Sequence, residues 1–139
     1  MSGEYTIGDH PSDLELTIRG ADLTEIFSTA ARAAAETAAP GAASGREVER
    51  RIELSAPNRE ELLVAWLNEI IYLLQVERFR PERFDFSVLS SDRLLALVRC
   101  RRAGPAAFSG GSEIKAATYH GLSIRETPSG WVAHVILDL

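Results

Sequence analysis

The sequence predicts an α+β domain, a two-layer sandwich in which two main helices pack on a mixed or largely antiparallel sheet. Three observations predict this class. Alternating apolar and polar residues indicate strands near both ends of the chain, two stretches between them carry helix-capping pairs, and the second helix has an apolar face wide enough to need a sheet as cover. A length of 139 residues, 45% of them hydrophobic, matches a single domain over residues 1–139 with its own core.

The first expected elements are a strand and a helix. Apolar and polar residues alternate over 14–18, which is typical of a strand with one buried face. Asp22 precedes Glu25 by three residues, the spacing of a capping box, so a helix should begin there. Its apolar stripe becomes alanine-rich, and the Gly- and Pro-containing segment 39–45 should end it as a flexible connection.

A second strand and a second helix follow. Alternation over 48–54 predicts the strand, and Arg50 on its apolar side indicates an edge position or a strand end. Asn58 and Glu61 form another capping box. The helix that they open carries a wide face of large apolar residues over 62–74, which a sheet must cover.

A hairpin is expected next. Residues 84–88 alternate as a strand, the polar segment 90–93 turns the chain, and 94–100 returns beside it. The Gly-, Ala- and Pro-rich segment 103–111 should be a loop.

The last third of the chain is less clearly patterned at its start. Residues 112–120 fit either a strand or a short helix capped by Ser112. A turn over 127–130 then leads into a final strand, 131–139.

Composition restricts the function. No apolar run is long enough for a membrane span and the N-terminus has no signal-peptide pattern, so we expect a cytoplasmic protein without membrane contact. The net charge of −5 argues against broad binding to nucleic-acid phosphates. Arginines do gather over 78–83 and 99–102, either as solvated faces beside acidic neighbours or as a docking patch for a partner or RNA. Cys100, the single cysteine, is expected to be a small buried hydrophobe.

Few residues stand out as chemical groups. The sequence has no phosphate-binding glycine loop, no nucleophile elbow and no histidine pair at zinc spacing. Lys115 is the only lysine among 15 cationic residues, which suggests that a compact ammonium is needed there, although chance is an equal alternative.

The two ends of the chain are rich in carboxylates. Asp9 and Asp13 flank His10 in "DHPSD", and Asp138 stands next to the terminal carboxylate of Leu139. Such oxygens suit Mg²⁺ or Ca²⁺, provided that the strand starting near Asp13 and the last strand lie close together. The alternative is a pair of ordinary solvated loops.

Four stretches resemble the archease family, in order and across nearly the whole chain. "DHPSD" resembles the family's D-H-T-A-D, and "EIKAATYHGLSI" resembles its E-I-K-A-V-T-Y-H-G-L. "ELLVAWLNEIIYLLQVERF" is similar to its leucine-rich helix with W-L-N-E-L, and "GWVAHVILDL" to its closing strand with an aspartate near the end.

The resemblance implies a protein cofactor, not an enzyme, which activates a GTP-dependent RtcB-type RNA ligase in tRNA splicing or RNA repair. Such a cofactor promotes guanylylation of a ligase histidine and multiple turnover, and it would meet RNA only through its partner. The resemblance also implies a divalent metal site made by Asp13, Asp138 and Leu139, with Ca²⁺ as the leading ion and Mg²⁺ or Mn²⁺ as alternatives.

The resemblance suggests three further residues. Lys115 matches the family lysine, and as a hypothesis its ammonium contacts a nucleotide phosphate or a ligase carboxylate. Asp9 and His10 would orient the metal ligands. The chain departs from the family pattern at Pro11 and Ser12, and in the 103–111 loop, where relatives often carry charged residues.

Two other functions compete with ligase activation. One is a chaperone-like partner of a tRNA methyltransferase, a role also implied by the resemblance. The other is a metal-dependent hydrolase using Asp13, Asp138 and an activated water, although no general base or substrate pocket is evident. We expect a monomer or a weak oligomer.

Overall fold

A computed structural model describes residues 3–8 and 12–139. Its elements, in chain order, are β1 (Glu4–Ile7), β2 (Asp13–Gly20), α1 (Leu23–Ala38), β3 (Ser44–Ser55), α2 (Arg59–Gln75), β4 (Phe79–Leu89), β5 (Arg93–Arg102), α3 (Pro105–Phe108), β6 (Ala116–Thr127) and β7 (Gly130–Asp138). The predicted α+β class with antiparallel strands is confirmed.

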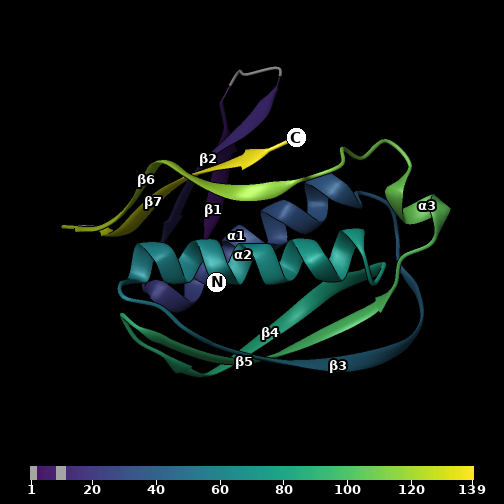
Figure 1. Ribbon diagram of the computed structural model, residues 1–139, viewed down its shortest axis with the longest axis horizontal. Helices are drawn as coiled ribbons and strands as arrows, with labels where there is room; N and C mark the ends of the chain where they lie inside the picture. Colours follow the sequence, from purple (N-terminus) through teal and green to yellow (C-terminus); the bar gives the residue numbers. More distant parts are fainter. Residues whose placement is uncertain (1–2, 9–11) are drawn as a thin grey trace.

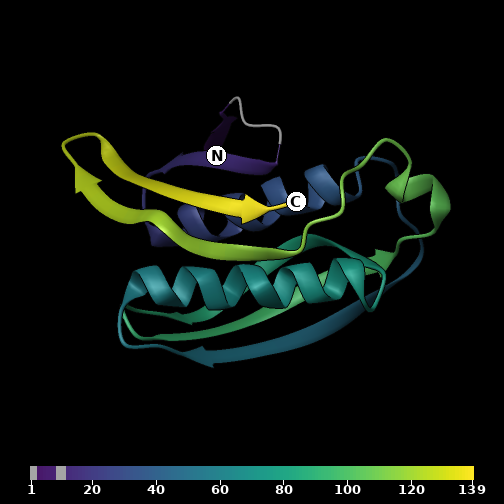
Figure 2. The same ribbon diagram turned by 45° about the horizontal axis from the view of Figure 1, so that its top comes forward.

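The strands form two separate sheets. One has the order β1-β2-β7-β6 and the other the order β3-β5-β4, and every described pairing is antiparallel. Helices α1 and α2 lie side by side between these sheets, as Figures 1 and 2 show. The structure therefore refines the expected sandwich, because the helices are covered by a sheet on each side.

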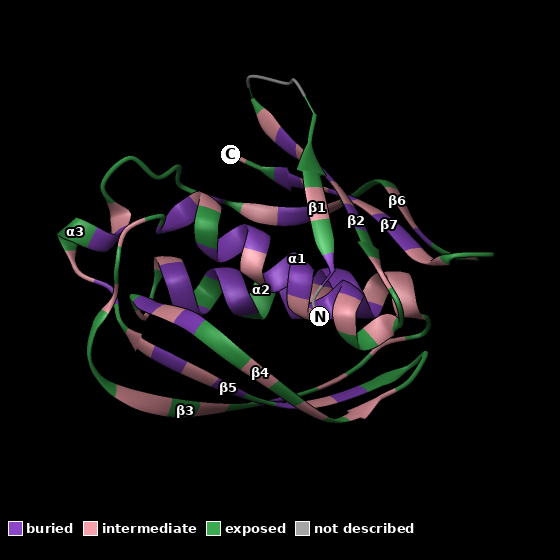
Figure 3. Ribbon diagram, turned by 180° about the vertical axis from the view of Figure 1, so that it is seen from behind, coloured by how far each residue is buried: buried purple, intermediate pink, exposed green. Residues whose placement is uncertain are grey.

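The helix compositions explain this burial on two sides. Helix α1 is lined with buried alanines, whose small side chains allow both sheets to approach closely. Helix α2 buries large apolar residues over a wide face and leaves only a narrow strip exposed, with Asn68, Glu69 and Tyr72 on it (Figure 3). Both predicted capping boxes are present, since Asp22 accepts from the Glu25 N–H and Asn58 from the Glu61 N–H, each at 2.9 Å.

The centre of the core is Trp66 on α2, which is fully buried. Its indole Nε1 donates to the carbonyl oxygen of Phe27 on α1 at 2.9 Å. Its ring also packs against Phe84 and Phe86 of β4, with centroids 5.9 and 5.1 Å away. One side chain thus connects both helices to the three-stranded sheet.

Arg50 occupies the kind of position that its sequence context predicts. Strand β3 is an edge strand of its sheet. The guanidinium of Arg50 pairs with Glu77 at 3.4 Å and lies over the Phe79 ring, 4.9 Å from the centroid. In the part of the chain that the structure describes, no helix is long and apolar enough to cross a membrane.

Candidate functional site: an acidic corner of the four-stranded sheet

The aspartates from the two ends of the sequence lie opposite each other in the structure. Strand β2 pairs with β7 in a register that sets Asp13 against Asp138. Figures 1 and 2 both show the yellow end of β7 beside the start of β2. Residues directly opposite in an antiparallel pair have Cβ atoms about 5 Å apart. The condition that the sequence set for a shared site, adjacent first and last segments, is therefore met.

The end of the chain is held in place on both sides. The Leu139 N–H donates to the Ser12 carbonyl oxygen at 3.4 Å, and the Lys115 N–H donates to the Asp138 carbonyl oxygen at 2.7 Å. Strand β7 lies between β2 and β6, so its last residue has a neighbour in each direction. The main chain of Leu139 consequently lies at the same corner as the two aspartates.

One oxygen at this corner has no partner among the described residues. Within residues 3–8 and 12–139, the buried Oδ1 of Asp13 makes no hydrogen bond. Leaving a buried acceptor unsatisfied costs about 1 to 3 kcal/mol, more for a charged group. A bound cation would remove that cost, and carboxylate oxygens are the ligands that Ca²⁺, Mg²⁺ and Mn²⁺ prefer.

The donor set fits a divalent ion only if the chain terminus takes part. Among residues 3–8 and 12–139, no group of three or more His, Cys, Asp or Glu side chains is placed to hold a metal. Asp13 and Asp138 supply two carboxylates, and the main-chain carboxylate of Leu139 would supply a third.

A hollow of about 280 Å³ opens at this corner, lined by Asp13, Asp138, Thr118, Ile136 and His120. His120 was not assigned to the site from the sequence, where the three histidines are far apart. Its place beside the aspartates depends on strand pairing, which the local pattern does not reveal.

An irregularity in β6 shapes the wall of this hollow. Thr118 pairs with Ile136 and the next pair is Ser123 with His134, so five steps along β6 match two along β7. The bulged segment includes Gly121 at φ +62°, a backbone conformation that glycine adopts without steric cost.

The remaining predicted site residues have different outcomes. Lys115 is exposed and is the last residue before β6, in an irregular segment, so the helical alternative for 112–120 is wrong. Its main-chain N–H donates to the Asp138 carbonyl oxygen, which places the backbone of Lys115 at the border of the acidic corner. Asp9 and His10 lie outside the described residues.

Three of the six clustered arginines pair with neighbouring carboxylates among the described residues. Three pairs on the three-stranded sheet have short N–O distances: Arg83 with Glu47 at 2.9 Å, Arg99 with Glu49 at 3.1 Å, and Arg101 with Glu82 at 3.0 Å. This arrangement favours the interpretation of solvated faces beside acidic residues over a docking patch for RNA.

His134 and Cys100, the two other residues with reactive side chains, make contacts within the fold. Nδ1 of His134 lies 3.1 Å from the Thr17 hydroxyl, on the neighbouring strand. Cys100 is fully buried, as expected, and its Sγ lies 3.7 Å from the Val48 carbonyl oxygen. Burial raises the pKa of the Cys100 thiol, which disfavours the reactive thiolate.

Comparison with known proteins gives a consistent result. A family model described as the Archease protein family (MTH1598/TM1083) matches residues 5–139. The protein archease of Methanosarcina mazei is 31% identical over 146 residues, covering 98% of this chain and 96% of that protein. The protein archease of Archaeoglobus fulgidus is 30% identical, covering 98% of this chain and 99% of that protein.

Two solved structures share the fold. The solution structure of Methanobacterium thermoautotrophicum protein 1598 superposes with a TM-score of 0.78 at 26% identity, covering 97% of this chain and 98% of that one. A crystal structure from Thermotoga maritima, described as an archease and possible chaperone, has a TM-score of 0.65 at 20% identity, covering 95% and 94% of the two chains.

Proposed function

Because this chain belongs to the archease family, we propose that it is a protein cofactor that activates a GTP-dependent RtcB-type RNA ligase in tRNA splicing or RNA repair. In this role it promotes guanylylation of the ligase and repeated turnover. One observation carries the proposal: Asp13, Asp138, the chain terminus and Lys115 come from three separate segments and meet at one corner of a sheet.

The corner would hold a divalent cation through Asp13, Asp138 and the carboxylate of Leu139. The buried, unpartnered Oδ1 of Asp13 supports this assignment. Ca²⁺ is the leading ion, with Mg²⁺ and Mn²⁺ as alternatives, because all three accept a set of oxygen ligands. Bound there, the ion would offset the repulsion among the carboxylates and hold the ends of β2 and β7 in one geometry.

Lys115 would act on the partner. Its side chain is exposed, and its main chain is anchored to Asp138. The ammonium can therefore reach a nucleotide phosphate or a carboxylate of a ligase docked at the corner. Asp9 and His10 would orient the ligands of the metal.

RNA would be reached through the ligase and not bound directly. The net charge is −5, and many arginines are paired with carboxylates. Both features oppose independent binding to a phosphate backbone.

A second candidate function is that of a chaperone-like partner for a tRNA methyltransferase. The description of the Thermotoga maritima relative as a possible chaperone favours keeping it. It uses the same fold with a different partner, so affinity capture from the source organism separates the two candidates.

The test is multiple-turnover ligation by the RtcB-type ligase of the same organism, with GTP and metal. The reaction is run without this protein, with it, and with the variants Asp13→Asn, Asp138→Asn and Lys115→Ala. Arg93→Ala serves as the matched control, because it removes an exposed cation at the start of β5, outside the acidic corner.

We expect wild type and Arg93→Ala to raise the turnover of the ligase. The three corner variants, each shown to be folded, should not raise it. Activation by all variants would support the ligase as the partner but would contradict the acidic corner as the activating site. No effect of wild type on an active but slow ligase would reject ligase activation itself.

A further inference from the structure

A second site lies between α1 and β4 and shares no residue with the acidic corner. It is a pocket of about 550 Å³, within the range of small-molecule sites. One wall is the face of α1 that carries Ser28, Thr29, Arg32 and Glu36. The other wall is the segment 80–85 of β4, which is an edge strand.

Of the three arginines that line this pocket, Arg83 pairs with Glu47, whereas Arg32 and Arg80 have no carboxylate partner among the described residues. Arg80 donates through Nε to the Ala39 carbonyl oxygen at 2.8 Å, and Arg32 donates through Nη2 to the Gly3 carbonyl oxygen at 3.0 Å. Across the described residues, neither forms an ion pair, and Nε of Arg32 is buried without a hydrogen-bond partner. Each guanidinium is held by main chain and keeps donors for an anion.

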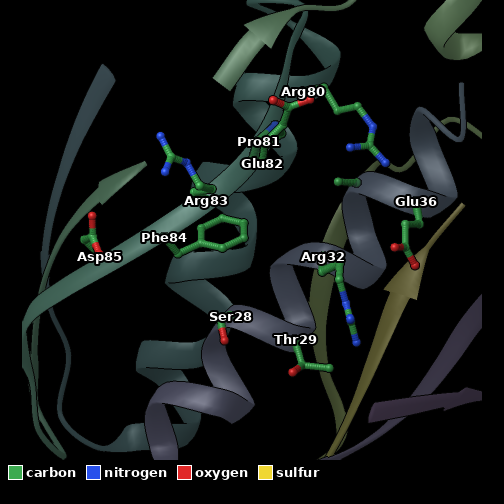
Figure 4. A pocket seen from close by; sticks show the side chains of 11 residues that line it. Ser28, Thr29, Arg32, Glu36, Arg80, Pro81, Glu82, Arg83, Phe84 and Asp85 are labelled. Carbon is green, nitrogen blue, oxygen red and sulfur yellow. The ribbon is translucent and has the colours of Figure 1, made fainter. Parts of the chain in front are cut away.

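A neutral donor and an aromatic ring complete the pocket. Thr29 is only 2% exposed, yet its hydroxyl has no hydrogen-bond partner in the part of the chain that the structure describes. Figure 4 shows Arg80 reaching from β4 toward α1 and the ring of Phe84 projecting into the space between these elements. The ring also packs edge-on against Trp66, so its position is fixed.

A carboxylate at the rim narrows the class of ligand. Glu36, on the α1 wall, is exposed and accepts a hydrogen bond from the Tyr5 hydroxyl. Its oxygens have further acceptor capacity, which the hydroxyls of a sugar would use and a bare inorganic anion would not. The pocket therefore combines guanidinium groups, an aromatic face and hydroxyl acceptors.

We infer that this pocket binds a nucleoside monophosphate. The phosphate is taken by Arg80, because guanidinium donors match phosphate oxygens. The base lies against Phe84, since every nucleobase has a face that stacks on an aromatic ring. The ribose hydroxyls donate to Glu36. This inference does not depend on ligase activation.

The test is a titration of the ¹⁵N-labelled chain, which at 15.2 kDa suits two-dimensional NMR. The probes are AMP, GMP, adenosine and inorganic phosphate. The nucleotides should produce saturable shifts in the amides of residues 28–36 and 80–85, with a Kd at or below about 1 mM. Adenosine and phosphate should each bind about tenfold or more weakly.

Variants assign the roles. Arg80→Gln should raise the Kd of AMP by about tenfold. Phe84→Leu should weaken the binding of AMP without changing the shifts that inorganic phosphate produces. Arg93→Gln is the charge-matched control, because Arg93 does not line the pocket. Thermal unfolding of each variant identifies any loss of fold, and the wild-type shift map stands without the variants.

Three results would overturn the inference. The first is the absence of saturable shifts in these amides at about 10 mM nucleotide, which is well above the expected Kd. The second is equal affinity for phosphate and AMP. The third is an unchanged affinity for AMP in the folded Arg80→Gln variant.

Discussion

Asp138→Asn should stabilise the metal-free protein, although it removes a residue of the proposed site. Asp13 and Asp138 are directly opposite in an antiparallel pair, so their Cβ atoms are about 5 Å apart. Two unit charges at 5 Å repel by about 1 kcal/mol in water and about 3 kcal/mol at a protein surface. The side chain of Asp138 is exposed, and screening favours the lower value, about 1 kcal/mol.

A hydrogen bond adds to this gain. The new amide can donate to the unpartnered Oδ1 of Asp13, which contributes about 0.5 to 1.5 kcal/mol. The free energy of unfolding should therefore rise by about 1.5 to 2.5 kcal/mol, or roughly 5 to 9 °C in Tm for a chain of this length.

Bound metal should make the wild-type protein more stable than Asp138→Asn, the reverse of their order without metal. A ligand present at 100 times its Kd stabilises the native state by about 2.7 kcal/mol, so wild type should gain roughly 10 °C in Tm when Ca²⁺ or Mn²⁺ replaces chelator. Asp138→Asn should gain much less.

The assay is thermal unfolding followed by circular dichroism, in EDTA and across a metal titration, at two salt concentrations. Added NaCl should reduce the advantage of the variant in EDTA, because its main cause is relief of repulsion. The reasoning is refuted if Asp138→Asn unfolds below wild type in EDTA, or if it keeps the full response to metal.

Three further predictions concern the core and the titrating groups. Trp66→Phe should lower the free energy of unfolding by about 2 kcal/mol in urea denaturation, because it leaves a cavity and removes the bond to the Phe27 carbonyl. Burial, the hydrogen bond to Glu36 and its negative charge raise the pKa of Tyr5 to about 12. Absorbance at 295 nm should therefore show one tyrosine titrating late, and its contribution to stability should disappear as pH rises from about 10 toward 12. Cys100 should react with a disulfide reagent at about pH 8 only on unfolding, because burial raises its pKa.

Each of these predictions has a clear contrary result. Trp131→Phe is the control for the core, since Trp131 is only partly buried and lies under the Arg59 guanidinium. An equal loss of stability in both variants would contradict the role given to Trp66. Tyr5→Phe should abolish the late titration step. As pH rises, Tyr5 loses its proton at a lower pH in the unfolded chain than in the folded one, so the free energy of unfolding should fall above pH 10. A free energy of unfolding that increases above pH 10 would contradict this prediction. Rapid labelling of native Cys100 would mean that the site opens locally.

The elements of the fold were largely predictable, because capping pairs and alternation are local signals. Both capping boxes form as expected, and Arg50 correctly indicates an edge strand. Strand β1 was missed because four residues are too few for a pattern, and α3 because a single turn in a Gly-rich segment resembles a loop. The division into two sheets was missed because alternation shows which residues face the core, but not which strands pair.

The acidic corner was predictable in part. Carboxylates at both ends predict a shared site only if β2 and β7 pair, and the structure shows that they do. His120 was missed because the bulge between Thr118 and Ser123 brings it to the hollow, and a bulge leaves little trace in one sequence. The α1–β4 pocket was also missed, since its two walls come from segments about 50 positions apart, which only folding brings together.

The most direct test of the central proposal is single-turnover guanylylation of the RtcB-type ligase, measured as transfer of label from [α-³²P]GTP to the ligase in the presence of metal. The account predicts that this protein accelerates formation of the labelled ligase and that folded Asp13→Asn and Lys115→Ala do not. Equal rates of labelling with and without the wild-type protein, for a ligase shown to be competent, would contradict it.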